Sequence, residues 1–185
     1  MEEVSGVSFT ITANSKLIIS SSGRLSSCQR YKKLLQDVLK LDIVYMPIHS
    51  SREDGKIDPQ EFSWALRGMP CIGGAISRDI KQSIIPFLDQ LDESAKEVNS
   101  VNTVVRTGSI LKGYDTDAMG FQAAVETGLA RIANVEVKSV VVYGYGGVTN
   151  VAAYIMKQLG KVVYITGRRE EMVRAKATEL GIEVW

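Results

Sequence analysis

The chain has 185 residues, of which 45% are hydrophobic, 23% charged and 7% aromatic, and this composition excludes a disordered or fibrous protein. Its 22 lysines and arginines nearly balance its 21 aspartates and glutamates, so the formal net charge is only +1. This balance excludes the strongly basic surface that a nucleic-acid backbone or an anionic membrane requires, and it favours a small-molecule partner.

No targeting or membrane segment is evident in the sequence. Residues 1–15 lack the apolar core of a signal peptide, and no apolar run approaches the roughly 20 residues of a membrane span. The two cysteines, Cys28 and Cys71, fit neither a disulfide framework nor a metal site. We therefore expect a cytoplasmic protein without a metal, in which both thiols are structural.

Strands and helices alternate along the first 91 residues. A strand at 16–20 runs through a Ser/Gly-rich turn into a helix that extends to about residue 40. The apolar residues of that helix recur at three- and four-residue spacing and predict its core face: Tyr31, Leu34, Leu35, Val38 and Leu39. The next elements are a strand at 42–48, a helix that begins at Asp58-Pro59 and ends near Gly68, a strand at 71–76 and a helix at 80–91.

A hairpin and a second α/β run follow. Residues 101–106 and 110–114 form the predicted hairpin, with Thr107, Gly108 and Ser109 at its turn. The later elements are a long helix at 117–132, a strand at 138–143, a helix at 148–160, a strand at 162–166, a helix at 169–180 and a strand at 182–185.

This pattern predicts an α/β fold with two lobes and mostly parallel sheets. The first is an N-terminal three-layer α/β lobe over residues 1–116, and the second is a partial Rossmann-type nucleotide-binding lobe over 117–185. A doubly wound nucleotide domain has about six parallel strands, and the second lobe has only three, so we expect a C-terminally truncated chain. Its last strand would be a bare apolar edge, which favours association into a homodimer.

The segment Val140 to Gly147 is the most informative local signal. A buried strand runs into the glycine turn Gly144-Tyr145-Gly146-Gly147, and a helix follows at Val148. Glycines of this kind bring backbone N–H groups close to a pyrophosphate at a helix N-terminus. Thr149 departs from the small third residue of the usual pattern, so a purely structural turn stays an alternative.

The end of the next strand distinguishes between the two nicotinamide dinucleotides. Thr166-Gly167-Arg168-Arg169 contains no carboxylate for a ribose 2′-hydroxyl and offers two arginines instead. Guanidinium groups suit a 2′-phosphate through charge-assisted hydrogen bonds, so NADP is favoured over NAD. The alternative is that Arg168 and Arg169 form a solvated helix start.

Three further segments carry a family resemblance. Val101-Asn102-Thr103-Val104-Val105 and Gly113 to Phe121 (GYDTDAMGF) resemble the A-V-N-T and G-x-N-T-D-x-x-G-F motifs of the shikimate dehydrogenases. Ile76 to Lys81 (ISRDIK) is similar to that family's V-T-x-P-x-K segment. The order and spacing hold over roughly residues 16–185. The S-G-R form at residues 22–24 is more like the shikimate-dehydrogenase-like branch.

The resemblance implies an NADP-dependent oxidoreductase that interconverts 3-dehydroshikimate and shikimate, or a related cyclic hydroxy acid, in aromatic amino acid biosynthesis. It makes the first lobe substrate-binding and the second NADP-binding, and it assigns Lys81 and Asp117 as the catalytic pair. The chemistry needs such groups, because a carbonyl that is reduced must gain a proton and the reverse reaction needs a base. Gly144, Gly146, Gly147, Val148, Thr166, Arg168 and Arg169 would bind the cofactor.

The resemblance also assigns Ser77 and Asn102 as substrate-binding residues. In the family two N-terminal serines bind the substrate carboxylate, and here Ser22, Ser26 or Ser27 could do so, with Arg24 as a charged partner. The alternative is an ordinary Ser/Gly turn that caps a helix. His49, the only histidine, has no partner motif and is interpreted as structural.

Two departures from the family pattern fall on this substrate side. Asp79 replaces the usual proline and Asp115 the usual asparagine. Asp115 could share a face with Asp117 or cap the following helix. These changes keep a second hypothesis open: a non-catalytic shikimate-dehydrogenase-like protein, or an inactive fragment, that binds a small acid or a nucleotide.

Overall fold

The structure, a computed structural model, describes residues 6–50, 52–132 and 134–185. The chain divides into two units. The N-terminal unit comprises Met1–Asp92 and Val101–Tyr114, and the C-terminal unit comprises Glu93–Ser100 and Asp115–Trp185. The division falls two residues before the boundary expected from the sequence, and it assigns residues 93–100 to the second unit.

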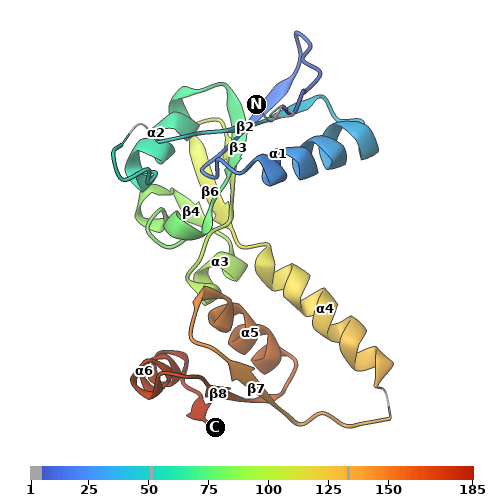
Figure 1. The fold of residues 1–185 in the computed structure, drawn as a ribbon, viewed down its shortest axis with the longest axis vertical. Helices are drawn as coiled ribbons and strands as arrows, with labels where there is room; N and C mark the ends of the chain where they lie inside the picture. Colours follow the sequence, from blue (N-terminus) through green and yellow to red (C-terminus); the bar gives the residue numbers. More distant parts are fainter. Residues whose placement is uncertain (1–5, 51, 133) are drawn as a thin grey trace, which may run out of the picture. The chain divides into compact units, whose positions relative to one another are not determined.

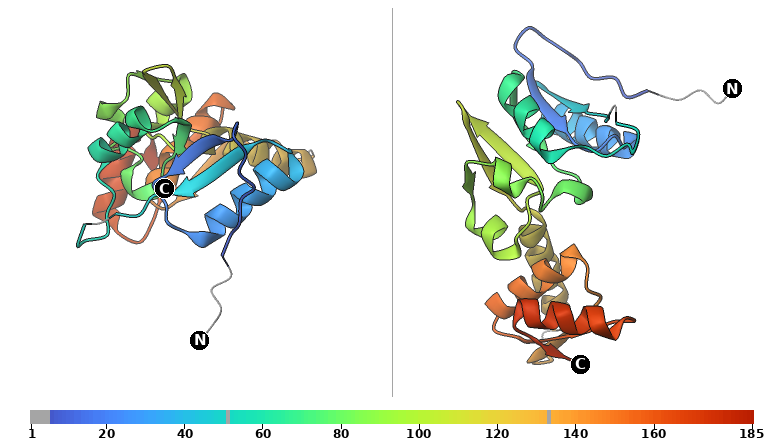
Figure 2. Two further views of the ribbon diagram at one scale, coloured as in Figure 1. Left: turned by 90° about the horizontal axis from the view of Figure 1, so that it is seen from above. Right: turned by 90° about the vertical axis from the view of Figure 1, so that its left-hand side faces the viewer.

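The N-terminal unit contains a six-stranded mixed sheet with the strand order β2-β1-β3-β5-β6-β4. β1 pairs in parallel with β2 and β3, and β4 pairs in parallel with β6, whereas β5 runs antiparallel to β3 and β6. Figure 2 shows the twisted hairpin of β5 and β6. The strands are β1 (Lys16–Ser20), β2 (Ile43–Pro47), β3 (Cys71–Ala75), β4 (Gln90–Leu91), β5 (Thr103–Thr107) and β6 (Ile110–Tyr114).

Helices cover both faces of this sheet, which gives three layers (Figure 1). On one face, α1 (Leu25–Lys32) packs through Cys28 against the β1–β2 side, in a cluster with Tyr45 and Ile18. On the other face lies α2 (Pro59–Gly68), where Leu66 is the nearest side chain to Gly74 of β3. The Asp58 carboxylate caps α2 by accepting from the N–H groups of its first turn, as the sequence predicts.

The predicted core face of the first helix is wrong at three of its five positions. Leu35 is buried and Tyr31 half-buried, but Leu34, Val38 and Leu39 are 45%, 60% and 51% exposed. The reason is that α1 continues as a π-helix, η1 (Lys33–Val38), with hydrogen bonds to the fifth preceding residue. The wider turn rotates later residues away from the face that a 3.6-residue period predicts.

The predicted helix at 80–91 is also wrong. The segment forms two short 3₁₀ turns, η2 (Arg78–Ile80) and η3 (Ile85–Phe87), and then strand β4. Pro86 lies in the first turn of η3, where it has no N–H to donate and where it restricts Ile85 before it. Ile80 and Ile84 are buried all the same, because these turns place them in the core.

The C-terminal unit contains a parallel sheet with the strand order β7-β8-β9. Its elements are α3 (Glu93–Val98), α4 (Asp117–Arg131), β7 (Ser139–Tyr143), α5 (Gly147–Gln158), β8 (Val162–Thr166), α6 (Glu170–Leu180) and β9 (Glu183–Val184). No helix in the described ranges is long and apolar enough to cross a membrane.

Both α5 and α6 lie on one face of this sheet. Val163 of β8 is buried with residues of α5, and Ile165, two residues later on the same face, is buried with residues of α6. Alternate positions point to the opposite face, and three of them, Val141, Tyr143 and Val162, are 43%, 70% and 55% exposed. The sheet of this unit is therefore covered on one side only among the described residues.

The buried side chain of Asn150 in α5 links three helices. Its Nδ2 donates to the carbonyl oxygen of Val98 in α3 at 3.3 Å, and its Oδ1 accepts from Lys176 of α6 at 3.2 Å. Val98 is fully buried in a cluster with Ala118, Val151 and other apolar residues of α4 and α5. These contacts explain why α3, which the sequence assigned to the first lobe, belongs to the C-terminal unit.

Candidate functional site

The carboxyl ends of β1 and β3 are joined by hydrogen bonds between the segments that follow them. The Ser21 N–H donates to the carbonyl oxygen of Ala75 at 3.0 Å, and the Ser77 N–H donates to Ser21 Oγ at 2.7 Å. Ser22 is half-buried, and its N–H donates to Ser20 Oγ at 3.1 Å. Ser22 and Ser77 therefore follow strands that end at the same edge of the sheet.

Asn102 lies at this edge because β5 runs antiparallel to β3 and begins where β3 ends. The Ile76 N–H donates to the Asn102 carbonyl oxygen at 2.8 Å, and the Asn102 N–H donates to the Tyr114 carbonyl oxygen at 3.0 Å. The Asn102 side-chain oxygen accepts from Thr103 Oγ1 at 2.9 Å. The amide of Asn102 is thus held beside the segment that carries Ser77.

Lys81 follows the 3₁₀ turn η2, and its backbone is tied to the same region. The carbonyl oxygen of Lys81 accepts from the Val101 N–H at 2.9 Å, next to Asn102, and the side chain is half-buried. Ser26 is exposed in the first turn of α1, a few residues beyond Ser22. The fold of the N-terminal unit thus gathers Ser22, Ser77, Asn102 and Lys81 at one sheet edge, with Ser26 in the helix that follows it.

Asp115 and Asp117 lie at the start of α4, in the C-terminal unit. Asp115 is only 1% exposed, and its Oδ1 accepts from the Asp117 N–H at 2.8 Å. Its Oδ2 is the one buried side-chain oxygen or nitrogen without a hydrogen-bond partner among the described residues. Asp117 itself is exposed. Because Lys81 and Asp117 belong to different units, their action as a pair stays a prediction.

The glycine turn between β7 and α5 is fixed by three hydrogen bonds. The Gly144 N–H donates to the Thr166 carbonyl oxygen at 2.8 Å, and Gly144 has φ +120°, which only glycine adopts readily. Thr149 is buried, its N–H donates to the Gly146 carbonyl oxygen, and its Oγ1 donates to the Gly144 carbonyl oxygen at 3.1 Å. The threonine that departs from the usual pattern thus serves to close the turn.

Gly146 and Gly147 are not required by the packing of the protein. Neither has a positive φ, and a Cβ added at either position would meet no atom within 4 Å. Gly146 is the N-cap of α5 and provides no side-chain cap. The first turn of the helix also contains no acidic residue. Open space above uncapped N–H groups is the arrangement that suits a phosphate, so these residues fit the pyrophosphate of a dinucleotide.

Thr166 ends β8, and Arg168 and Arg169 follow it at the same edge, because Thr166 is paired with Tyr143 in the parallel ladder. Both arginines are exposed. Neither guanidinium group takes part in a hydrogen bond or ion pair with any residue that the structure describes. Two unpaired cations therefore stand one strand away from the glycine turn, where a 2′-phosphate could bind them.

Comparison with known proteins gives one consistent relationship. No family model matches the chain. The shikimate dehydrogenase (NADP(+)) of Lysinibacillus sphaericus is 32% identical over 150 residues, which cover 78% of this chain and 51% of that protein. The enzyme of the same name from Desulforamulus reducens is 32% identical over 150 residues, which cover 79% and 47%. The chain belongs to the shikimate dehydrogenase family.

Solved structures in this family share the fold. A shikimate 5-dehydrogenase-like protein superposes with a TM-score of 0.79 at 23% identity, over 95% of this chain and 62% of that one. The shikimate dehydrogenase of Aquifex aeolicus gives 0.75 at 27% identity, over 95% and 64%. A quinate dehydrogenase from Corynebacterium glutamicum gives 0.75 at 28% identity, over 90% and 60%. The chain spans about half the length of the curated relatives it matches.

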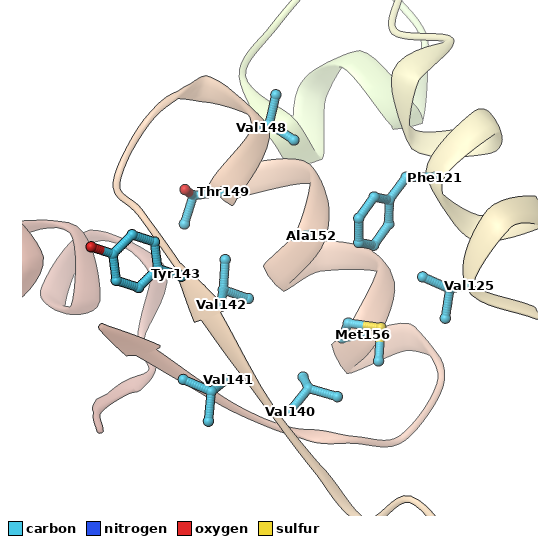
Figure 3. A pocket seen from close by; sticks show the side chains of 10 residues that line it. All are labelled: Phe121, Val125, Val140, Val141, Val142, Tyr143, Val148, Thr149, Ala152 and Met156. Carbon is cyan, nitrogen blue, oxygen red and sulfur yellow. The ribbon is translucent and has the colours of Figure 1, made fainter. Parts of the chain in front are cut away.

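Beside the glycine turn of this family member lies an apolar hollow of about 400 Å³ (Figure 3). Val148 and Thr149 line its end nearest the glycine turn, and the rest of the hollow extends along β7 between α4 and α5. Its other lining residues are Phe121, Val125, Val140, Val141, Val142, Tyr143, Ala152 and Met156. Its walls are mainly apolar side chains, so the hollow fits an apolar occupant better than the phosphates of a cofactor.

Two contacts beside the predicted site residues were not expected from the sequence. Ser21 is buried and orients the Ser77 backbone, although only the neighbouring serines were assigned from the resemblance. His49 lies directly over Gly23, a contact that joins the ends of two different strands. No local signal in the sequence could have shown either contact, because both depend on the pairing of strands that are far apart along the chain.

Proposed function

We propose that this chain carries the binding residues of an NADP-dependent oxidoreductase that interconverts 3-dehydroshikimate and shikimate, or a related cyclic hydroxy acid. The observation that carries the proposal is the single sheet edge of the N-terminal unit that gathers Ser22, Ser77, Asn102 and Lys81. A ring with a carboxylate and several hydroxyls needs such a set of short polar side chains with one ammonium group.

The proposed cofactor is NADP, which would supply a hydride acceptor when bound. Gly146 and Gly147 leave open space at the uncapped start of α5, where the pyrophosphate would lie. Arg168 and Arg169 would bind the 2′-phosphate that distinguishes NADP from NAD. The curated relatives carry NADP(+) in their names, which supports the same choice.

In the proposed mechanism, Lys81 and Asp117 accept the proton of the substrate hydroxyl that is oxidised, and they return it in the reverse reaction. That proton must leave the oxygen as a carbonyl forms, and it must return in the reverse direction. A lysine Nζ and a carboxylate can each accept and return a proton, and a lysine ammonium can stabilise charge on the oxygen. Ser77 and Asn102 would hold the ring so that the reacting hydroxyl lies next to Lys81.

The test is NADPH formation when the chain is mixed with NADP and either shikimate or quinate, with NAD as the comparison. We expect Lys81→Ala to lower turnover roughly 10²- to 10⁴-fold, which is the usual contribution of a positioned acid or base. Lys56→Ala, an exposed lysine of the same unit, should leave turnover unchanged. Shikimate binding without turnover would contradict the proposed enzymatic activity and favour a binding protein or an inactive fragment.

Two further proposals concern the state of the chain in the cell. The free, buried thiols of Cys28 and Cys71 support a cytoplasmic location, where cysteines stay reduced. The apolar residues on the uncovered face of the β7–β9 sheet support self-association into a homodimer. From the sequence, the exposed apolar edge was expected at residues 182–185. Val141, Tyr143 and Val162 are further exposed apolar residues, on the uncovered face of the sheet.

A further inference from the structure

His49 and Gly23 are in direct contact at the ends of the two neighbouring strands β2 and β1. A Cβ added to Gly23 would lie 2.3 Å from Cε1 and 2.6 Å from Nδ1 of His49, closer than any real Cβ contact. The Ile48 N–H donates to the Ser20 carbonyl oxygen at 2.7 Å, which holds the end of β2 against that of β1. Glycine at position 23 is therefore what allows the imidazole to lie on the loop.

The loop under this imidazole has the character of an anion site. Arg24 is the N-cap of α1, its side chain does not cap the helix, and the first turn contains no acidic residue. A cation at a helix N-terminus is unfavourable unless an anion binds there. Arg24 and His49 make no side-chain hydrogen bond or ion pair within the part of the chain that the structure describes. The turn after Ser77 adds Arg78 and Asp79, whose charges offset each other.

We propose that His49 is a specificity-determining residue, which donates a ring N–H to the carboxylate of the bound hydroxy acid beside Ser22 and Arg24. The inference rests on the proposed function, since it names the group that the acid would meet at this edge. An imidazole has at least one N–H donor in either tautomer, and the exposed ring has its nitrogens available. Gly23 acts as a positioning residue, because any larger side chain would push the ring away.

The test compares shikimate binding by calorimetry for the unmodified chain and for variants at both positions. His49→Ala should raise the Kd about tenfold, which is typical when a hydrogen bond to a charged group is lost. Gly23→Ala should raise it similarly, but should add little when His49→Ala is already present. Gly68→Ala is the matched control, because a Cβ at Gly68 meets no atom within 4 Å, and it should leave the Kd unchanged.

The methyl ester of shikimate separates the proposed contact from a structural role of His49. The ester lacks the carboxylate charge, so the unmodified chain and His49→Ala should bind it about equally. An equal loss of affinity for acid and ester would overturn the inference, as would an unchanged Kd for shikimate in His49→Ala. Failure of the unmodified chain to bind shikimate at all would overturn the proposed function itself, and the inference with it.

Discussion

Thr149 donates its hydroxyl to the carbonyl oxygen of Gly144 at 3.1 Å, across the glycine turn that links β7 to α5. Gly144 is the residue with φ +120°, and its own N–H is bonded to Thr166 of the next strand. The hydroxyl therefore ties the start of α5 to the one position of the turn that has a positive φ. A residue that departs from the dinucleotide-binding pattern thereby preserves its backbone shape.

Replacing Thr149 by valine should destabilise the C-terminal unit by about 1 kcal/mol, because a similar shape is kept while the donor to Gly144 is lost. Thr149→Ser keeps the donor and should recover most of the loss. Urea unfolding followed through Trp185 measures this, in a Trp64→Phe background that removes the other tryptophan. Equal midpoints for the valine and serine variants would contradict the role assigned to the hydroxyl.

The second prediction concerns Asp115. Its carboxylate is buried, one oxygen accepts from the Asp117 N–H, and the other has no partner among the described residues. Asp115→Asn keeps an oxygen for the Asp117 N–H and removes the buried charge, so it should raise the free energy of unfolding by roughly 1 kcal/mol. Asp115→Ala loses the bond as well and should be less stable than Asp115→Asn. The opposite order in thermal unfolding would refute this account.

Acid should weaken the contact between Asp89 and Arg67. Two hydrogen bonds from the Arg67 guanidinium, at 2.9 and 3.1 Å, and one from the Leu111 N–H, at 2.7 Å, hold the pKa of Asp89 below its ordinary value. A lowered pKa in the folded state contributes stability above the unfolded-state pKa, and this contribution is lost as the pH falls through the folded-state pKa. The unmodified chain should therefore be more stable than Asp89→Asn at about pH 6, and the difference should shrink below about pH 4.

Urea midpoints at several pH values check this prediction. In an Arg67→Met background the same substitution should have a smaller effect, because the largest cause of the lowered pKa is gone. A difference between the unmodified chain and Asp89→Asn that does not change with pH would show that the carboxylate charge is irrelevant there.

Local sequence signals predict an element well when one signal is present, and they fail when two compete. Residues 162–166 form β8 as predicted, because a run of β-branched and aromatic residues lies between glycines. At 80–91 the apolar spacing suits a helix, but Pro86 opposes it and prevails. The apolar spacing of 31–39 does not show that the helix widens into π geometry, which changes the exposed side.

The candidate site was predictable only where its residues are close along the chain. The glycine turn and the two arginines after β8 follow from short motifs, and the structure places both at the same edge of one sheet. The contact of His49 with Gly23 depends on β1 and β2 being neighbours, which periodicity does not specify. The bond between Ser21 and Ser77 spans 56 residues and is equally invisible to a local pattern.

Cofactor choice should depend on the two arginines after β8. Replacing Arg168 and Arg169 together by alanine should raise the Kd for NADP at least tenfold and leave that for NAD nearly unchanged, because only NADP has a 2′-phosphate. Calorimetric titration with each nucleotide measures both constants. Arg131→Ala, at the end of α4, is a control for the loss of positive charge in the same unit. An equal loss of affinity for both nucleotides would show that the arginines bind a part of the cofactor other than the 2′-phosphate.

The uncovered face of the β7–β9 sheet should govern how the chain associates. A parallel sheet is normally covered on both faces, yet Val141, Val162 and Trp185 are 43%, 55% and 70% exposed. Val141→Lys places a charge on this face, in the edge strand β7, and should shift the chain from larger species toward the monomer. Val38→Lys, at a 60% exposed position of the N-terminal unit, is the matched control and should not. Sedimentation velocity over a range of concentrations measures the outcome. If the unmodified chain stays monomeric at every concentration, the proposed homodimer is wrong, because the apolar face alone does not drive association.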